Sequence, residues 1–219
     1  MTIRIRKWVC ICGLLAATAM SSGCSTEMWR HMAYLGWGGR GKKVKAKFAG
    51  LAGKTVAVVV YSDRRTLYEF PDLNLTLSAA IAGRLDKNVK NIKVVPPARV
   101  VRYQDENIYW EEMDKADLGK ALGADFVLYV PMEEFGTRLP DSSYLYQGRA
   151  TCEPAVYDVT KLPKDSRVYK GEKIRILYPE HEPAGALNEN DRQIRITTEA
   201  MFADKLTKLF YAHKEEVPR

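Results

Sequence analysis

The run of five consecutive apolar residues Val56–Val60 constrains the fold of this chain more than any other feature. Four of the five are valines, and a continuous β-branched run of this length is typical of a strand that is buried on both faces. Such a strand needs a layer of packing elements on each side of its sheet. We therefore expect a central strand at 55–61 in a layered α/β domain.

Helix signals follow this strand, after a loop that we place at 62–71. The apolar residues repeat at every fourth position, which keeps one side of a helix apolar: Leu73, Leu77, Ile81 and Leu85. Asp72 or Asn74 is expected to cap this helix. Ile92–Val95 then predicts a second strand, and Pro96-Pro97 predicts a break whose second proline suits the first turn of a short helix.

A further helix and a third strand come next. Asp114 is a candidate N-cap and Gly123 a candidate stop for the helix between them. Phe126–Val130 is an apolar run that follows this helix. Because helices separate the three strands, we expect the strands to lie parallel.

The second half of the chain changes character. Segments 143–159 and 167–178 alternate between apolar and polar residues, which predicts a β-hairpin with a medium loop. Pro154 indicates a break or an edge position in the first segment, because proline cannot donate to a ladder. A last helix is expected over 191–213. The whole pattern predicts an α/β (α+β) fold: a mixed sheet of about five strands with two to four packing helices, in the order β-α-β-α-β-β-β-α.

The first 23 residues have the pattern of a signal peptide. Arg4, Arg6 and Lys7 form a basic start, and Trp8–Ala19 is an apolar run of 12 residues. A spanning helix needs about 20 residues, so this run is too short to cross a membrane.

Two processing sites compete at the end of this segment. Ser21-Ser22-Gly23-Cys24 looks like a bacterial lipobox, in which a small residue precedes a cysteine that takes acyl chains such as palmitate. Several buried chains, at about 0.8 kcal/mol per CH₂, make such an anchor stable. We therefore expect a lipoprotein signal peptide at 1–23 and lipid attachment at Cys24. The alternative is Ala17-Thr18-Ala19, a site for the ordinary signal peptidase that would give a secreted protein.

Cysteine usage fits an acylated chain. Cys10 and Cys12 leave with the signal peptide, so the mature chain keeps Cys24 and Cys152. If Cys24 is acylated, no disulfide is available within one chain. Cys152 is then expected to be a small buried hydrophobe.

Residues 24–50 are predicted to form a basic, Gly-rich tether ahead of a single domain at 51–219. The tether carries six basic residues against one acid, whereas the domain is almost neutral. The residues expected to contact a membrane surface are Arg40, Lys42, Lys43, Lys45 and Lys47, each adding about 1 kcal/mol near anionic headgroups. A merely solvated linker is the alternative. Nucleic-acid binding is not expected, because the basic residues lie in the tether and not on a folded face.

Three segments resemble the periplasmic lipoprotein domains of the TolB amino-terminal, curli-secretion (CsgG) and penicillin-binding-protein activator (LpoB) type. They are Lys54–Val59, Asp117–Leu128 and Val156–Val159. The resemblance runs over roughly residues 52–213, although Pro131 stands where those domains usually have a glycine. It implies a non-enzymatic accessory domain at the outer membrane that works through protein contacts. It also raises the expectation of a homo-oligomer, since curli-type relatives form rings.

No motif predicts a cofactor or a metal. Gly36–Lys42 satisfies glycine-rich nucleotide-binding templates, but Lys43 stands where a P-loop needs Ser or Thr. His31, His181 and His213 are far apart in sequence and form no metal-ligand pair.

Our first functional hypothesis is a non-catalytic binding or assembly factor of the cell envelope. It would be anchored by acylated Cys24 at the periplasmic face of the outer membrane, with the inner membrane or secretion as alternatives. Its partner would contact a sheet edge and the Phe135–Tyr146 loop, with Phe135, Tyr144 and Tyr146 as contact residues. The alternative is an envelope hydrolase that uses paired carboxylates on a glycan, drawn from Glu106, Glu111, Glu112 and Asp117.

Overall fold

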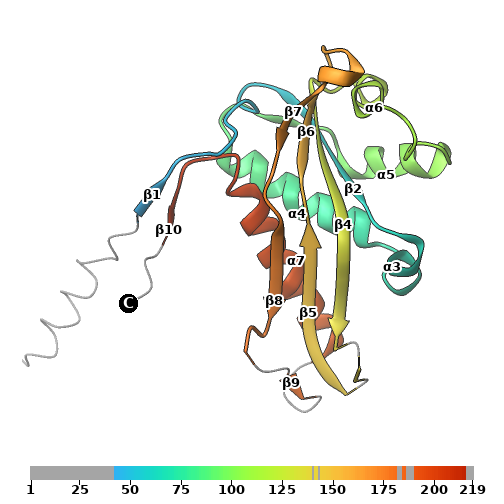
Figure 1. The fold of residues 1–219 in the computed structure, drawn as a ribbon, viewed down its shortest axis with the longest axis vertical. Coiled ribbons are helices and arrows are strands. Elements are labelled where there is room, and N and C mark those ends of the chain that lie inside the picture. Colours follow the sequence, from blue (N-terminus) through green and yellow to red (C-terminus); the bar gives the residue numbers. More distant parts are fainter. Residues whose placement is uncertain (1–41, 140, 143, 182–183, 186–189, 216–219) are drawn as a thin grey trace, which may run out of the picture. The chain divides into compact units, whose positions relative to one another are not determined.

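The computed structural model describes residues 42–139, 141–142, 144–181, 184–185 and 190–215 (Figure 1). Residues Lys43–His213 form one compact unit. Of a second unit, made of residues 1–42 and 214–219, the structure describes Lys42, Lys214 and Glu215. None of the described helices is long and apolar enough to cross a membrane.

The centre of the compact unit is a mixed sheet. Five strands form its main path in the order β3-β2-β4-β5-β8, and three further strands pair beside this path. Strand β2 is parallel to β3 and β4, whereas β5 and β6 are antiparallel to β4. The bounds are β2 Thr55–Tyr61, β3 Lys93–Val94, β4 Phe126–Arg138, β5 Leu145–Cys152, β6 Ala155–Asp158, β7 Arg167–Lys170, β8 Ile174–Tyr178 and β9 Ala184–Gly185. The predicted α/β class with a mixed sheet is confirmed.

Helices cover this sheet in two layers (Figure 1). Helices α4 and α7 pack on one face, and α5 and α6 pack on the other. The helices are α3 Arg64–Glu69, α4 Leu73–Asn88, α5 Pro97–Glu106, α6 Lys115–Leu122 and α7 Asp191–Thr207. Two short strands, β1 Lys42–Val44 and β10 His213–Glu215, stand at the ends of the described chain.

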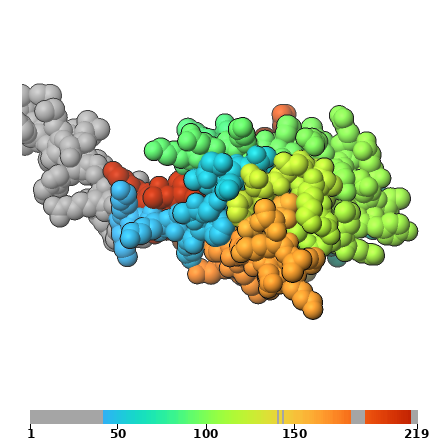
Figure 2. All heavy atoms as spheres, turned by 90° about the horizontal axis from the view of Figure 1, so that it is seen from above, coloured from blue at the N-terminus to red at the C-terminus, as the bar shows by residue number. Residues whose placement is uncertain are grey.

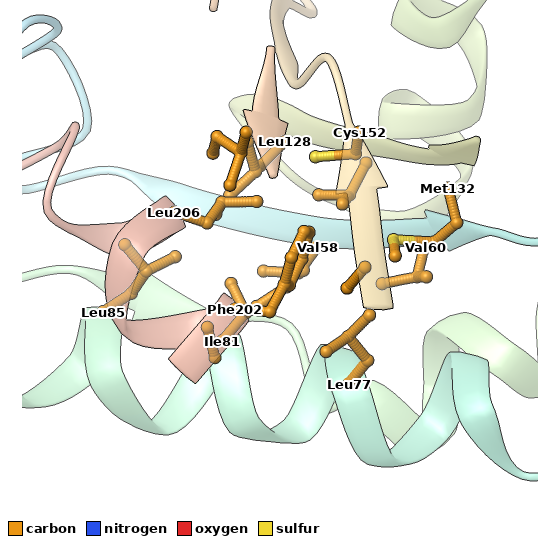
Figure 3. Close-up of a cluster of buried hydrophobic side chains, with 14 of the residues drawn as sticks. Val58, Val60, Leu77, Ile81, Leu85, Leu128, Met132, Cys152, Phe202 and Leu206 are labelled. Atoms are coloured by element: carbon orange, nitrogen blue, oxygen red, sulfur yellow. The ribbon is translucent and has the colours of Figure 1, made fainter. Parts of the chain in front are cut away.

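The valine run explains why both layers exist. Successive side chains of a strand point to opposite faces, so Val58 and Val60 join the core under α4 and α7. Ala57 and Val59 join the core under α5 and α6. Figure 3 shows Val58 near Phe202 of α7, within the first of these cores.

Strand β4 belongs to two differently covered halves of the sheet. Its first part, 126–131, pairs with β2 on one edge and with β6 on the other. Pro131 stands opposite Tyr61, and the pairing with β2 ends there, as expected for a residue without an N–H for the ladder. Its second part, 132–138, pairs with β5. We call β2, β3, β6, β7 and the first part of β4 the scaffold half. We call β5, β8 and the second part of β4 the open half.

The predicted hairpin is present but divided. Segment 143–159 contains β5 and β6, and these pair antiparallel with β8 and β7 respectively. The division falls at Pro154, whose carbonyl accepts a hydrogen bond from the Gly171 N–H at 2.7 Å. A single turn of 3₁₀ helix, Pro163–Asp165, lies in the loop between the two segments.

Two helix ends match their predictions. The Asp114 carboxylate accepts a hydrogen bond from the Ala116 N–H at 2.7 Å and caps α6. Gly123 ends that helix with a left-handed φ of 69°. Asp72 occupies the N-cap position of α4 without making a side-chain cap, because its carboxylate binds Arg195 of α7 at 2.6 Å instead.

Three predicted boundaries are wrong. Helix α3 forms inside the expected loop 62–71, where Asp63 accepts a hydrogen bond from the Thr66 N–H at 2.7 Å. Strand β4 continues past Val130 to Arg138 because β5 pairs with the extension. Helix α7 ends at Thr207 rather than at 213, and tight turns bring Phe210 back into the core.

The last residues of the predicted tether contact the domain. The N–H groups of Lys47 and Phe48 both donate to the Leu209 carbonyl, at 2.8 and 3.1 Å. The Phe48 ring lies 5.4 Å from the ring of Tyr169. This packing begins before Leu51, which is fully buried.

Candidate protein-binding surface

The open half of the sheet is covered by helix α7 on one face. An added Cβ at Gly148 of β5 would lie 1.7 Å from the Thr198 hydroxyl of α7, so the helix rests directly on the strand. Ala150 and Cys152 of β5 and Ile174 and Ile176 of β8 are buried in the core on this side. The alternate residues must therefore point to the other face.

That other face is polar and partly accessible, and we call it the open face. It is defined by Glu133, Glu134, Arg149, Thr151, Lys173 and Arg175. Five of them, all except Arg149, line a shallow depression of about 430 Å³. Helices α5 and α6 pack on β2, β4 and β6 of the scaffold half. The side chains of Glu133, Lys173 and Arg175 are exposed.

Ion pairs arrange the charges of the open face. The Arg149 Nε atom lies 2.6 Å from Glu134 Oε1, and its Nη1 donates to the Arg138 carbonyl. Lys173 Nζ lies 2.8 Å from Glu133 Oε2, and this hydrogen bond raises the pKa of Lys173. With three bases and two acids the face is nearly balanced in charge. It therefore suits a protein surface better than a polyanion.

The predicted contact residues are split by the structure. Tyr144 is 80% exposed in the loop that joins β4 to β5. Tyr146 follows on β5, where the Arg138 guanidinium lies 5.4 Å from the centre of its ring. Phe135 instead lies in the core, 8% exposed and edge-on to Phe70 at 5.1 Å. It faces α4 and α7, so its ring is not part of a surface.

The basic residues expected at a membrane surface differ in their surroundings. Lys42, Lys43 and Lys45 are exposed. Lys47 forms a salt bridge of 2.7 Å with Glu172. Cys24, Arg40 and the predicted signal peptide 1–23 lie outside the described residues, so acylation and signal-peptide processing stay predictions.

The carboxylates of the hydrolase alternative lie on α5, on α6 and on the segment between them. Glu106, Glu111 and Glu112 are exposed, and Asp117 forms a salt bridge of 2.8 Å with Lys120. These residues are not among those that line the depression. Within the described ranges, no group of three or more His, Cys, Asp or Glu side chains is placed to hold a metal ion.

Cys152 has the buried position that the sequence predicts. Its side chain is fully buried on β5, facing α7. Burial raises the pKa of its thiol, with smaller contributions from the nearby charges of Glu133 and Glu153. A thiol in this state is a poor nucleophile.

Sequence reasoning missed the charged residues of the open face. The available signal was the alternation in β5, where Arg149 and Thr151 stand between Gly148, Ala150 and Cys152. That alternation predicts a strand with one polar face. It does not predict that β8 and the end of β4 extend the same face.

Comparisons with known proteins are weak. No family model matches the chain, and no curated protein matches its sequence. A PelC dodecamer from Paraburkholderia phytofirmans is similar in structure, with a TM-score of 0.44, 12% identity, and coverage of 79% of this chain and 99% of that one. A lipoprotein, GNA1162 from Neisseria meningitidis, has a TM-score of 0.38, 16% identity, and coverage of 69% and 97%. The structural neighbours thus include a bacterial lipoprotein, but likenesses this weak carry no argument about function.

Proposed function

We propose that this chain is a lipid-anchored envelope protein that binds a protein partner through its open face and performs no catalysis itself. Acylated Cys24 would hold it at the periplasmic face of the outer membrane. The Gly-rich tether would place the domain near that surface, with Lys42, Lys43 and Lys45 contacting anionic headgroups.

One observation carries the partner-binding part of this proposal: among the residues that the structure describes, helices lie on both faces of the scaffold half of the sheet but on one face only of its open half. A sheet in a layered domain is normally covered on each apolar face. The open face is instead built from charged side chains in ion pairs, which can remain exposed to water without an energetic penalty. A partner surface with matching charges can replace water on it without leaving a buried charge unpaired.

The anchor is tested by the intact mass of the protein extracted from membranes, with Cys24→Ala as control. The proposal predicts a mature chain that begins at an acylated Cys24, and loss of membrane association in the variant. An unacylated chain that begins near Met20 would make the protein secreted and would contradict the anchor.

The binding surface is tested by photo-crosslinking in intact cells. A photoreactive phenylalanine analogue replaces Arg175 on the open face and, as a matched control, Lys87 on the exposed side of α4. We expect a discrete adduct with one envelope protein from position 175 and none from position 87. Adducts of equal yield from both positions, or none from either, would contradict a specific partner at the open face.

The absence of catalysis is part of the same proposal. If the hydrolase alternative held, replacing its carboxylates would abolish glycan turnover by the purified mature protein. The variants are Glu106→Gln, Glu111→Gln, Glu112→Gln and Asp117→Asn. We expect no turnover by the unmodified protein, and turnover that any of these changes abolishes would contradict us.

A further inference from the structure

Two adjacent apolar side chains point into solvent between α5 and α6. Ile108 is 79% exposed and Tyr109 is 73% exposed. A single exposed apolar residue is ordinary on a protein surface. Two adjacent bulky apolar residues that are both exposed on one short connection are less common. The residues next to this pair indicate what it could bind.

The connection is held in place by buried and hydrogen-bonded groups. Trp110 is 6% exposed and meets the ring of Tyr61 edge-on at 6.0 Å. The Lys115 ammonium donates to the carbonyls of Glu111 at 2.8 Å and of Met113 at 3.1 Å, and lies 5.0 Å from the ring centre of Tyr129. Burial lowers the pKa of Lys115.

A hydrogen bond also closes the start of the connection. Asn107 Nδ2 donates to the Tyr103 carbonyl at 2.8 Å, and the Trp110 N–H donates to the Asn107 carbonyl at 2.9 Å. Ile108 and Tyr109 lie inside this turn. They are therefore presented on an ordered backbone, which lowers the entropic cost of binding at this point.

The apolar pair lies within an acidic stretch of the sequence. The ten residues Asp105–Asp114 contain five acids and no base. The Lys115 ammonium donates to the two carbonyls and also interacts with the Asp114 and Glu111 carboxylates, and Lys120 pairs with Asp117. We call residues 105–114 the acidic knob. In Figure 2 the α5–α6 segment (green to yellow-green) lies at the opposite end of the compact unit from residues 43–48 (blue).

We propose that the acidic knob docks a segment of a second protein in which basic side chains flank an apolar one. The charge and the exposed apolar side chains of the knob distinguish between a membrane, a nucleic acid and a protein segment as the bound partner. An anionic membrane surface is repelled by a segment with more acids than bases, as is a nucleic acid. A basic segment is attracted to these acids, while Ile108 and Tyr109 supply the apolar contact that strengthens such interfaces. The knob shares no residue with the open face, so this inference is independent of the function proposed above.

The test measures binding of short fluorescent peptides to the mature full-length protein by anisotropy. One peptide alternates leucine with lysine, and two matched peptides carry glutamate for lysine or serine for leucine. We expect binding of the leucine-lysine peptide alone. We also expect the affinity to fall by about tenfold or more in the double variant Ile108→Ser, Tyr109→Ser, and in Glu111→Gln, Glu112→Gln.

Tyr68→Ser is the matched control, because Tyr68 is 92% exposed on α3 and lies outside the knob. It should leave the affinity unchanged, and Arg175→Glu on the open face should do the same. Unchanged binding by the Ile108, Tyr109 double variant would overturn the proposal. Sedimentation showing that the protein self-associates through Tyr109 would also overturn it, since the occupant would then be a second copy. Each variant is checked by its melting temperature, which should match that of the unmodified protein.

Discussion

The scaffold half and the open half of the sheet share strand β4 but are built differently. In the scaffold half, Val56–Val60 are all buried because helices lie on both faces. In the open half, apolar residues face α7, and the alternate residues form the open face with its ion pairs. Strand β4 is thus buried on both faces over the first part of its length and carries polar side chains on one face over the second part.

This difference separates stability from accessibility. Fully buried apolar side chains account for most of the apolar area that folding removes from water. Each Å² of this area stabilises the fold by about 25 cal/mol. A partly exposed ion pair contributes about 0–1 kcal/mol. Changes in the shared core should therefore lower the free energy of unfolding by several kcal/mol, whereas changes on the open face should leave stability almost unchanged and affect what the protein binds.

The largest effect is expected where both halves share one core. Phe202 of α7 is fully buried among residues of β2, β5 and α4. Phe202→Ala should lower the free energy of unfolding by about 3–5 kcal/mol, because it leaves a cavity. Its neighbour Met201 is 39% exposed, so Met201→Ala should cost about 1 kcal/mol or less. Urea unfolding measures both, and similar losses would contradict the assignment of the core.

The next effect compares helix packing on the two halves. An added methyl at Gly119 of α6 would lie 2.3 Å from Val159, and one at Gly148 of β5 would lie 1.7 Å from the Thr198 hydroxyl. Each Gly→Ala change should cost about 1–3 kcal/mol through overpacking. Gly83→Ala in α4 is the control with the opposite sign. It meets nothing within 4 Å and should add about 0.5–1 kcal/mol.

Thermal unfolding of the three glycine variants provides the measurement. Thr198→Ala should recover part of the loss in the Gly148→Ala background, because it removes the atom closest to the added methyl. A neutral Gly148→Ala change on its own would mean that α7 does not rest on β5.

A smaller, pH-dependent effect concerns the contact between α4 and α7. Arg195 lies 2.6 Å from Asp72 at the start of α4 and 2.7 Å from Glu199. The hydrogen bond from Arg195 holds the pKa of the Asp72 carboxyl below its usual value. A lowered folded-state pKa contributes stability above the unfolded value of about 3.9, and this contribution is lost as the pH falls through the folded-state value.

The pair of Arg195 with Asp72 should therefore contribute about 0.5–1 kcal/mol at neutral pH, a modest figure because Asp72 is exposed and screened. Arg195→Gln removes this pair together with the one to Glu199, so its total cost is larger. A double-mutant cycle with Asp72→Asn measures the coupling. It should shrink as the pH falls below about 4. A coupling that stays constant down to the pH at which Asp72 is protonated would mean that this pair is not its source.

The smallest effect on stability, and a decisive one on binding, is expected on the open face. Lys173→Glu breaks the pair with Glu133 and should leave the free energy of unfolding almost unchanged, because both side chains are exposed and solvent screens their charges. It should nevertheless abolish crosslinking from position 175. The charge-swapped pair Glu133→Lys, Lys173→Glu should restore the ion pair but not the crosslink. A crosslink that survives both changes would place the partner elsewhere.

Local signals in the sequence identified most of the fold. Four local signals each act within one element, and all are present in the structure: the valine run, the apolar residues at every fourth position from Leu73 to Leu85, the Asp114 cap and the break at Pro154. The class and the order of elements follow from them. The errors arose where a contact between residues distant in sequence determines the structure. The Asp72 side chain binds Arg195 instead of capping its helix, and the Phe210 ring lies beyond the end of its helix, 6.1 Å from the ring of Tyr169.

The candidate surface was harder to predict for the same reason. Tyr144 is exposed as expected of a contact residue, whereas Phe135 lies in the core because bulges in β4 between 132 and 138 change which residues face α7. The open face unites Glu133, Arg149 and Lys173 from three segments of the chain, and only their pairing in one sheet brings them together.

The central claim, that a partner occupies the open face, is tested most directly by comparing thiol labelling in intact envelopes and in purified protein. Single cysteines replace Arg175 on the open face and Lys87 on α4, while Cys152 stays unreactive because it is buried. We predict equal labelling rates at both positions in the purified protein, and slower labelling at position 175 alone in envelopes. Equal rates at both positions in envelopes would contradict the claim.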